Sequence, residues 1–284
     1  MSARSYKMTE ELRQRWINEG RGKGEGVNYK GWLTTNDVNS LGNKTREKER
    51  LHGHTCHWLS DQETTVARVL QLNPFVTAIC DSYPLRIEDS RAIAAELGIK
   101  HPADPETGVD INLTTDIVLE LTTAHTIRII PFNIKMDKDL QAFNNIEHAE
   151  IERRWWARHG RQLGFLNASP KYISSILAEN AKEVAFHAWI HTDVWPTATY
   201  LDDIGRRLLL EIARSNNGCT IAEFCQELDV LLGVCAGDCL KILYSQLARR
   251  QMTADFRSKL VHQHTTAELL ACNPHLANAS RRKA

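Results

Sequence analysis

Asp116-Ile-Val-Leu-Glu-Leu121 opens the most informative stretch of the chain, and Ile127-Arg-Ile-Ile-Pro-Phe-Asn133-Ile-Lys135 closes it. Two apolar runs around a short polar segment predict a β-hairpin with its turn near Ala124. Side chains alternate between faces along a strand, so Asn133 and Lys135 share one face. Asp116 then falls opposite Phe132 or Asn133, and an acid, an amide and a lysine meet on one side of a sheet.

This combination of side chains suits metal-dependent hydrolysis of a phosphodiester. A carboxylate holds a hard divalent cation, a second oxygen completes the coordination, and a lysine sits beside the attacking water. The pattern resembles the Asp…(Asp/Glu)-x-Lys core of restriction-type nucleases. An amphipathic hairpin with a solvated polar face would show the same loose spacing, so spacing alone leaves both interpretations open.

Composition indicates a soluble, globular protein. The chain has 284 residues, of which 25% are charged and 42% hydrophobic, enough for one large or two ordinary domains. The formal net charge is zero, so any contact with DNA must come from local patches. The seven cysteines lack framework spacing and predict reduced thiols. Neither a membrane segment nor a signal peptide is expected, which predicts a cytoplasmic protein.

The first fifty residues carry two basic segments. Glu19-Gly-Arg-Gly-Lys-Gly-Glu-Gly26 is rich in glycine but lacks the Gly-Lys-Ser/Thr ending of a phosphate-binding loop, so we reject a nucleotide site there. It is either a flexible linker or a loop whose backbone and cations approach phosphates. The second basic segment runs from Lys44 to Arg50.

Four potential soft ligands for a metal follow within Leu51-His-Gly-His-Thr-Cys-His57. His52, His54 and Cys56 would share one face of a strand, as the ligands of a zinc site could. No partner pair follows at the usual zinc spacing. We therefore favour a polar strand near DNA, with a zinc site as the alternative.

The N-terminal part reads as a mixed sheet with flanking helices. Ser60-Asp-Gln-Glu63 is a capping box that opens a helix to about Leu72, so Glu63 is either a structural cap or a carboxylate directed at the site of Asp116. Further elements are expected as strands over 79–85 and 162–166 and a helix over 137–159. Pro131 within a strand implies a bulge or an edge position.

The C-terminal part has helical periodicity almost throughout. We expect helices over 200–215, 220–225 and 233–250, followed by a short β-wing over 251–260, which is the order of a winged-helix domain. The third helix is rich in Cys, Leu and Ala, so we favour protein contacts over base reading. The predicted domains are residues 1–169 and 170–284.

Several stretches resemble the TnsA family, the endonuclease subunits of heteromeric bacterial cut-and-paste transposases. They span residues 19 to about 156 in order, which makes the set more specific than any one motif. The matching stretches are Glu19-Gly-Arg-Gly-x-Gly-x-Gly26, Trp32-Leu-Thr34, Leu59-Ser-Asp-x-Glu63, Tyr83-Pro-Leu85, Gly98-Ile-Lys-His-Pro102, Thr115-Asp116, Lys135 and Glu152-Arg-Arg-x-Trp156.

The resemblance implies a restriction-endonuclease-like catalytic domain followed by an all-helical, winged-helix-like domain. It implies cleavage of transposon-end DNA at the 5′ ends, beside a transposase subunit that cuts the 3′ ends and an AAA+ ATPase regulator. A stand-alone restriction-type endonuclease, or a DNA-binding regulator with a degenerate nuclease fold, are the alternatives. The resemblance also implies a bacterial protein that is associated with the nucleoid when bound to DNA, and none of these functions involves a membrane.

Carried over position by position, Glu63, Asp116 and Lys135 match the family's catalytic acid, acid and lysine, and Glu152 matches a further acid. The expected cofactor is Mg²⁺, which Mn²⁺ can replace, and two ions are expected. The ligands would be Glu63, Asp116, Asn133 and the Ile134 carbonyl. Asn133 stands where the family has Gln, so its amide is one methylene shorter. The candidates for contacts with DNA phosphates are Arg21, Lys23, Lys44, Arg46 and Lys48.

Overall fold

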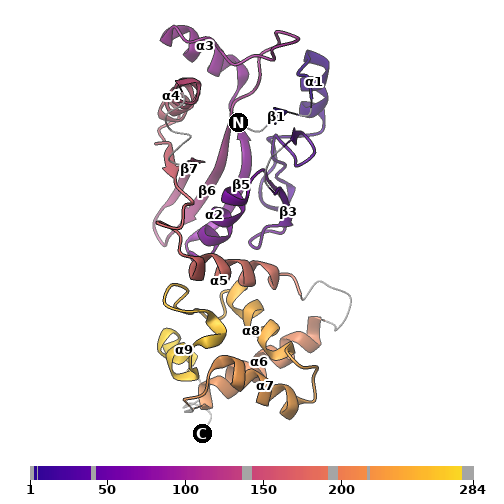
Figure 1. Cartoon of the computed structure of the whole chain (residues 1–284), viewed down its shortest axis with the longest axis vertical. Coiled ribbons are helices and arrows are strands. Elements are labelled where there is room, and N and C mark those ends of the chain that lie inside the picture. The colour runs from indigo at the N-terminus through magenta and orange to yellow at the C-terminus, as the bar shows by residue number, and fades with distance from the viewer. Residues whose placement is uncertain are drawn as a thin grey trace. The chain divides into compact units, whose positions relative to one another are not determined.

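The computed structural model describes residues 3–4, 6–39, 43–135, 143–190, 198–215 and 218–276. The chain divides into two compact units, Met1–Tyr172 and Ile173–Ala284 (Figure 1). The sequence placed this division after residue 169. Each unit is described by itself below.

The first unit is built on a four-stranded mixed sheet in the order β5-β6-β7-β8. Strands β5 (Val76–Pro84), β6 (Thr114–Thr122) and β7 (Ile127–Ile134) are antiparallel, and β8 (Gly164–Leu166) runs parallel to β7. The predicted hairpin is formed by β6 and β7, in which Ile117 pairs with Phe132.

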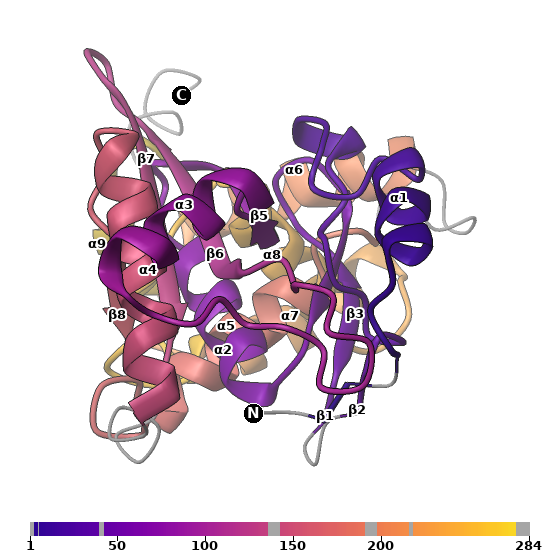
Figure 2. The same cartoon turned by 90° about the horizontal axis from the view of Figure 1, so that it is seen from above.

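Helices and a small hairpin flank this sheet. Helices α3 (Ile87–Leu97) and α4 (Phe143–Arg158) lie to one side of β5–β7 in Figure 1, and their apolar side chains enclose a core with Val118 of β6. The other side carries the hairpin of β3 (Thr45–Lys48) and β4 (Thr55–Trp58). Figure 2 shows α2 (Asp61–Gln71) between these two sides, and α2 contacts both β4 and β5. Residues 137–142 of the predicted helix lie outside the described residues.

The N-terminal segment packs against the same sheet. It contains β1 (Ala3–Arg4), which pairs with β2 (Val38–Asn39), together with α1 (Glu10–Asn18) and the 3-10 turn η1 (Gly26–Asn28). The glycine-rich stretch between α1 and η1 is not a flexible linker. Gly20, Gly22, Gly24 and Gly26 all have left-handed φ values, and a Cβ on Gly22 would lie 2.2 Å from Pro84 Cγ.

The alternation of side chains between the two faces of the sheet breaks near the C-terminal end of β5 and the N-terminal end of β6. Ser82 has a φ of 43° and lies opposite Asp116, between the pairs Asp81–Ile117 and Tyr83–Thr115. As a consequence, Cys80 and Tyr83, which are three residues apart on β5, both pack against the core formed with α3 and α4. A buried non-glycine residue in this conformation is strained, and such strain concentrates at functional sites.

Pro131 causes no bulge in β7. The pairing of β6 with β7 runs without a register shift from Ile117–Phe132 to Thr122–Ile127. Pairing with β8 begins only at Phe132, so Pro131 lies just outside that ladder, in the edge position that a residue without an N–H tolerates.

The second unit is helical in its described residues. It contains α5 (Ser175–Phe186), α6 (Ala198–Arg214), α7 (Ile221–Leu232), α8 (Asp238–Ala248), the 3-10 turn η3 (Val261–Gln263) and α9 (Thr266–Cys272). Among these helices, the end of α7 differs most from the prediction. The helix extends seven residues beyond the expected end at Cys225 and is followed by the left-handed Gly233.

The predicted β-wing is wrong, because residues 251–260 form bends and turns with no strand. Buried side chains, not a partner strand, satisfy this backbone. Asn180 donates to the Phe256 and Lys259 carbonyls, and Asn273 bonds both the N–H and the carbonyl of Thr253. Such side-chain bonds compete directly with a strand ladder. In the described part of the chain, no helix has the length and apolar character needed to cross a membrane.

Candidate active site

The β6–β7 hairpin brings four of the predicted site residues together. Asp116 Oδ2 accepts a hydrogen bond of 2.8 Å from the Ile134 N–H, and Lys135 Nζ lies 3.8 Å from the same oxygen. The Asp116 N–H donates in return to Asn133 Oδ1 at 3.1 Å. The side chains of Asp116 and Lys135 are 25% and 29% exposed, so solvent and ligands can reach them.

Glu63 is held at the start of α2 by local hydrogen bonds. Ser60 caps the helix by accepting from the Glu63 N–H, and its hydroxyl donates to Glu63 Oε1 at 3.0 Å. Glu63 Oε2 accepts from the Leu59 N–H at 2.8 Å, one residue before the position expected for a capping box. Burial and then the charge of Asp116 raise the pKa of Glu63 to about 8, against these hydrogen bonds and Lys135.

Glu152 of α4 forms a second, buried carboxyl group behind the hairpin. Its oxygens accept from the Thr115 hydroxyl at 2.5 Å and from Asn133 Nδ2 at 2.6 Å. Trp156 Nε1 donates to the same Thr115 hydroxyl at 2.8 Å. Burial raises the pKa of Glu152 to about 7, although both hydrogen bonds oppose the shift.

The site residues form one electrostatic group. Asp116 raises and Lys135 lowers the pKa of both Glu63 and Glu152, so all four charges lie close together. Closely placed carboxyls of unequal pKa are typical of functional sites. The break in alternation opposite Ser82 contributes to this arrangement, because Thr115 as well as Val118 faces α4 while Asp116 bonds the Ile134 N–H.

The donor set suits a hard divalent cation, since Glu63 and Asp116 offer carboxylate oxygens beside a lysine. Asn133, the amide among the predicted ligands, makes hydrogen bonds within the protein. It is only 3% exposed, and its oxygen accepts from Asp116 while its nitrogen donates to Glu152. Asn133 therefore orients the two acids. Ile134 lies at the end of β7, where its N–H donates to Asp116 Oδ2.

Arg21 and Lys44, which are among the five expected phosphate contacts, make contacts within the protein. Arg21 is paired with Glu19 at 2.8 Å and Asp37 at 2.6 Å, donates to the Trp32 carbonyl, and is only 14% exposed. Lys44 Nζ donates to two backbone carbonyls, of Thr35 and Val38. The structure thus assigns both cations to holding the N-terminal segment. Lys23, Arg46 and Lys48 are exposed.

Sequence reasoning missed three participants in this region, Thr115, Ser82 and Asp81. Thr115 carried a signal, since it precedes Asp116 in the matched Thr115-Asp116 pair. Ser82 carried none, because its strained backbone is a property of the fold. Asp81 belongs with two residues of the His/Cys stretch: His54, Cys56 and Asp81 form the one group of three potential metal ligands found among the described residues.

Comparison with known proteins supports the resemblance seen in the sequence. No protein-family profile matches the chain. A curated relative, the "Transposon Tn7 transposition protein TnsA" of Escherichia coli, is 34% identical over 166 residues. The chain is TnsA-like. The match covers 58% of this chain and 59% of that relative, so the chain spans somewhat more than half the length of the protein it matches. The similarity to TnsA predicted from the sequence motifs is thereby confirmed.

Proposed function

We propose that this protein is the metal-dependent DNA endonuclease subunit of a heteromeric transposase, which hydrolyses the phosphodiester at the 5′ ends of the transposon. The observation that carries the proposal is the placement of Lys135 Nζ 3.8 Å from Asp116 Oδ2, next to Glu63, in a chain similar to a transposition protein. An acidic pair that can hold a divalent cation, beside a lysine, suits metal-assisted hydrolysis of a phosphodiester.

Glu63 and Asp116 would hold Mg²⁺, with Mn²⁺ as a substitute, and the Ile134 carbonyl is a further candidate ligand. The bound cation, one or two ions in number, supplies Lewis acidity and a nucleophilic water at neutral pH. Lys135 orients that water and offsets the negative charge that develops on the phosphorus oxygens. Asn133 holds the backbone of Asp116 by accepting from its N–H, and Glu152 fixes the Asn133 amide by accepting from its Nδ2.

DNA would approach the face of the first unit that carries exposed cations. Lys23, Arg46 and Lys48 are exposed, and they would position the duplex through its phosphates without reading its sequence. The second unit, which we propose to be winged-helix-like without a β-wing, would contact protein partners. Those partners are the transposase subunit that cuts the 3′ ends and an AAA+ ATPase regulator.

The test is strand-specific cleavage of DNA that carries a transposon end, in Mg²⁺ or Mn²⁺, with and without the cognate transposase and ATPase. A cut at the 5′ end that needs the partners is the expected result. Cutting by the chain alone would favour a restriction-type endonuclease. Sequence-selective binding by residues 173–284, with no metal-dependent cut under any condition, would replace the proposal with a regulator whose nuclease fold is inactive.

A further inference from the structure

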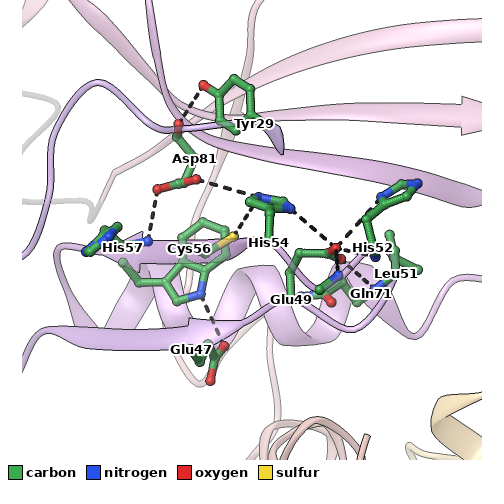
Figure 3. Close-up of polar contacts among 12 residues, drawn as sticks. Tyr29, Glu47, Glu49, Leu51, His52, His54, Cys56, His57, Gln71 and Asp81 are labelled. Atoms are coloured by element: carbon green, nitrogen blue, oxygen red, sulfur yellow. Dashed lines mark hydrogen bonds and ion pairs between the residues drawn. The ribbon is translucent and has the colours of Figure 1, made fainter. Parts of the chain in front are cut away.

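A second cluster of metal-ligating side chains lies between the β3–β4 hairpin and β5. His54 Nε2 is 3.1 Å from Cys56 Sγ and 3.8 Å from Asp81 Oδ1, and all three donor atoms lie within 4.8 Å of one another (Figure 3). All three residues are buried, at 3%, 0% and 0% exposure. Their donors are a nitrogen, a sulfur and an oxygen, whereas the candidate active site offers carboxylate oxygens.

Neighbouring groups contact the atoms of Asp81 and His54 that point away from the cluster. Asp81 Oδ2 accepts from the His57 N–H at 2.9 Å, which leaves Oδ1 directed at His54. Asp81 Oδ1 is buried and has no hydrogen-bond partner among the described residues. Burying a carboxylate oxygen without a hydrogen bond is costly. Its orientation toward His54 and Cys56, two other potential ligands, points to a bound cation.

Glu49 orients the imidazole from its far side. Glu49 Oε1 lies 3.3 Å from His54 Nδ1. The carboxylate is fully buried and is fixed by the backbone N–H groups of Leu51, His52 and Gly53. A carboxylate on one ring nitrogen of a histidine commonly leaves the other nitrogen as a metal ligand. His52 Nδ1 lies 3.7 Å from the same Glu49 oxygen, so His52 stays outside the ligand group.

We propose that His54 Nε2, Cys56 Sγ and Asp81 Oδ1 bind a zinc-class divalent cation. Tetrahedral zinc places N and S ligands about 3.6 Å apart and N and O ligands about 3.4 Å apart. The observed separations of 3.1 and 3.8 Å lie within about 0.5 Å of these values, so a small shift of the side chains brings all three donors onto one ion. Thiolate and imidazole select zinc over magnesium, which prefers oxygen. On binding, the Cys56 thiol gives its proton to solvent as the sulfur–metal bond forms.

The site would join two parts of the first unit. His54 and Cys56 belong to the chain entering and forming β4, and Asp81 lies on β5, so the cation would link the hairpin to the central sheet. Strand β4 ends at Trp58, and the next residue, Leu59, donates to Glu63. The proposed cation would thus hold the segment that leads into the candidate active site. The proposal does not depend on nuclease activity.

Metal analysis of the untagged full-length protein tests the inference. We expect close to one equivalent of zinc per chain after dialysis, and a lower melting temperature after removal of zinc by a strong chelator. Replacement by Co²⁺ should give a thiolate-to-cobalt charge-transfer band. Neither zinc nor a cobalt band in the folded wild-type protein would overturn the proposal and leave a hydrogen-bonded polar cluster.

Matched variants locate the ion. Cys56→Ser and Asp81→Asn should each lose the zinc equivalent, and Cys56→Ser should lose the cobalt band. Cys80→Ser should keep both, because Cys80 packs against the core beneath α3 and α4. Glu63→Gln should also keep both, since Glu63 belongs to the other site. Full zinc content in folded Cys56→Ser and Asp81→Asn would also contradict the assignment.

Discussion

Asn133 bridges the two acids behind the β6–β7 hairpin: its Nδ2 donates to Glu152 Oε2 at 2.6 Å, and its Oδ1 accepts from the Asp116 N–H. Both the oxygen and the nitrogen of the Asn133 amide are hydrogen-bonded, and the side chain is buried. A side chain in this position acts by holding others in place. The bridge accounts for the proximity of Glu152 to Asp116 without requiring Asn133 to touch a metal.

Asn133→Ala should lower the free energy of unfolding by about 1–3 kcal/mol, because it leaves a buried carboxyl oxygen and a strand N–H without partners. Denaturant unfolding in EDTA measures this loss. His125→Ala, in the exposed turn of the same hairpin, should change stability by no more than about 0.5 kcal/mol. Equal effects from the two variants would mean that the bridge contributes nothing to stability.

Glu63→Gln should change how the stability of the metal-free protein depends on pH. The folded pKa of about 8 lies above the ordinary value of 4.5, so folding favours the protonated acid. The stability that Glu63 contributes is fully present below about pH 4.5 and is lost as the pH rises through 8. Gln cannot ionise, so the variant should be the more stable protein at pH 9. Parallel pH profiles of the two proteins from pH 5 to 9 would refute the raised pKa.

Gly22→Ala should destabilise the protein more than Gly20→Ala. Both positions have left-handed φ values, 71° and 78°, which cost a residue with a Cβ roughly 1–2 kcal/mol. Only at Gly22 would the Cβ also collide with Pro84, which adds about 1–3 kcal/mol. A Cβ on Gly20 would have no atom of a non-adjacent residue within 4 Å. Thermal unfolding of both variants checks the order, and a smaller loss for Gly22→Ala would show that the loop does not pack on β5.

Arg21→Ala and Arg46→Ala should separate folding from DNA binding. Arg21 lies 4.2 Å over the Trp16 ring and pairs with Asp37, so its removal should lower the melting temperature. Arg46 is exposed on β3, and its removal should leave stability unchanged. Loss of one phosphate contact should reduce by about 0.9 the magnitude of the slope of log K for DNA binding against the logarithm of the salt concentration. An unchanged slope for Arg46→Ala would remove it from the proposed DNA surface.

Local patterns predicted the centre of the fold well. The apolar runs around Ala124 gave the β6–β7 hairpin, and the register that pairs Ile117 with Phe132 sets Asp116 opposite Asn133, one of the two partners expected. Capping residues likewise predicted the start of α2, where Ser60 accepts from the Glu63 N–H. These features depend on residues close in sequence, which is why one sequence contains enough information for them.

Features that depend on distant residues could not be predicted in this way. Asp81 follows Cys56 by 25 positions, and only the packing of β4 against β5 brings them together. The prediction of a β-wing over 251–260 was wrong because Asn180 and Asn273, which lie outside this segment, form hydrogen bonds with its backbone. The sequence also did not show that Arg21 pairs with Asp37, which is 16 residues away.

Cleavage of DNA carrying a transposon end, in the full assembly with its partners, tests the central claim most directly when Asp116→Asn and Lys135→Ala are compared with wild type. The account predicts that the 5′-strand cut requires Mg²⁺ or Mn²⁺ and is lost in both variants, while their circular dichroism spectra and melting curves show that they remain folded. Full 5′-strand cleavage by both folded variants, or cleavage by wild type in excess EDTA, would contradict it.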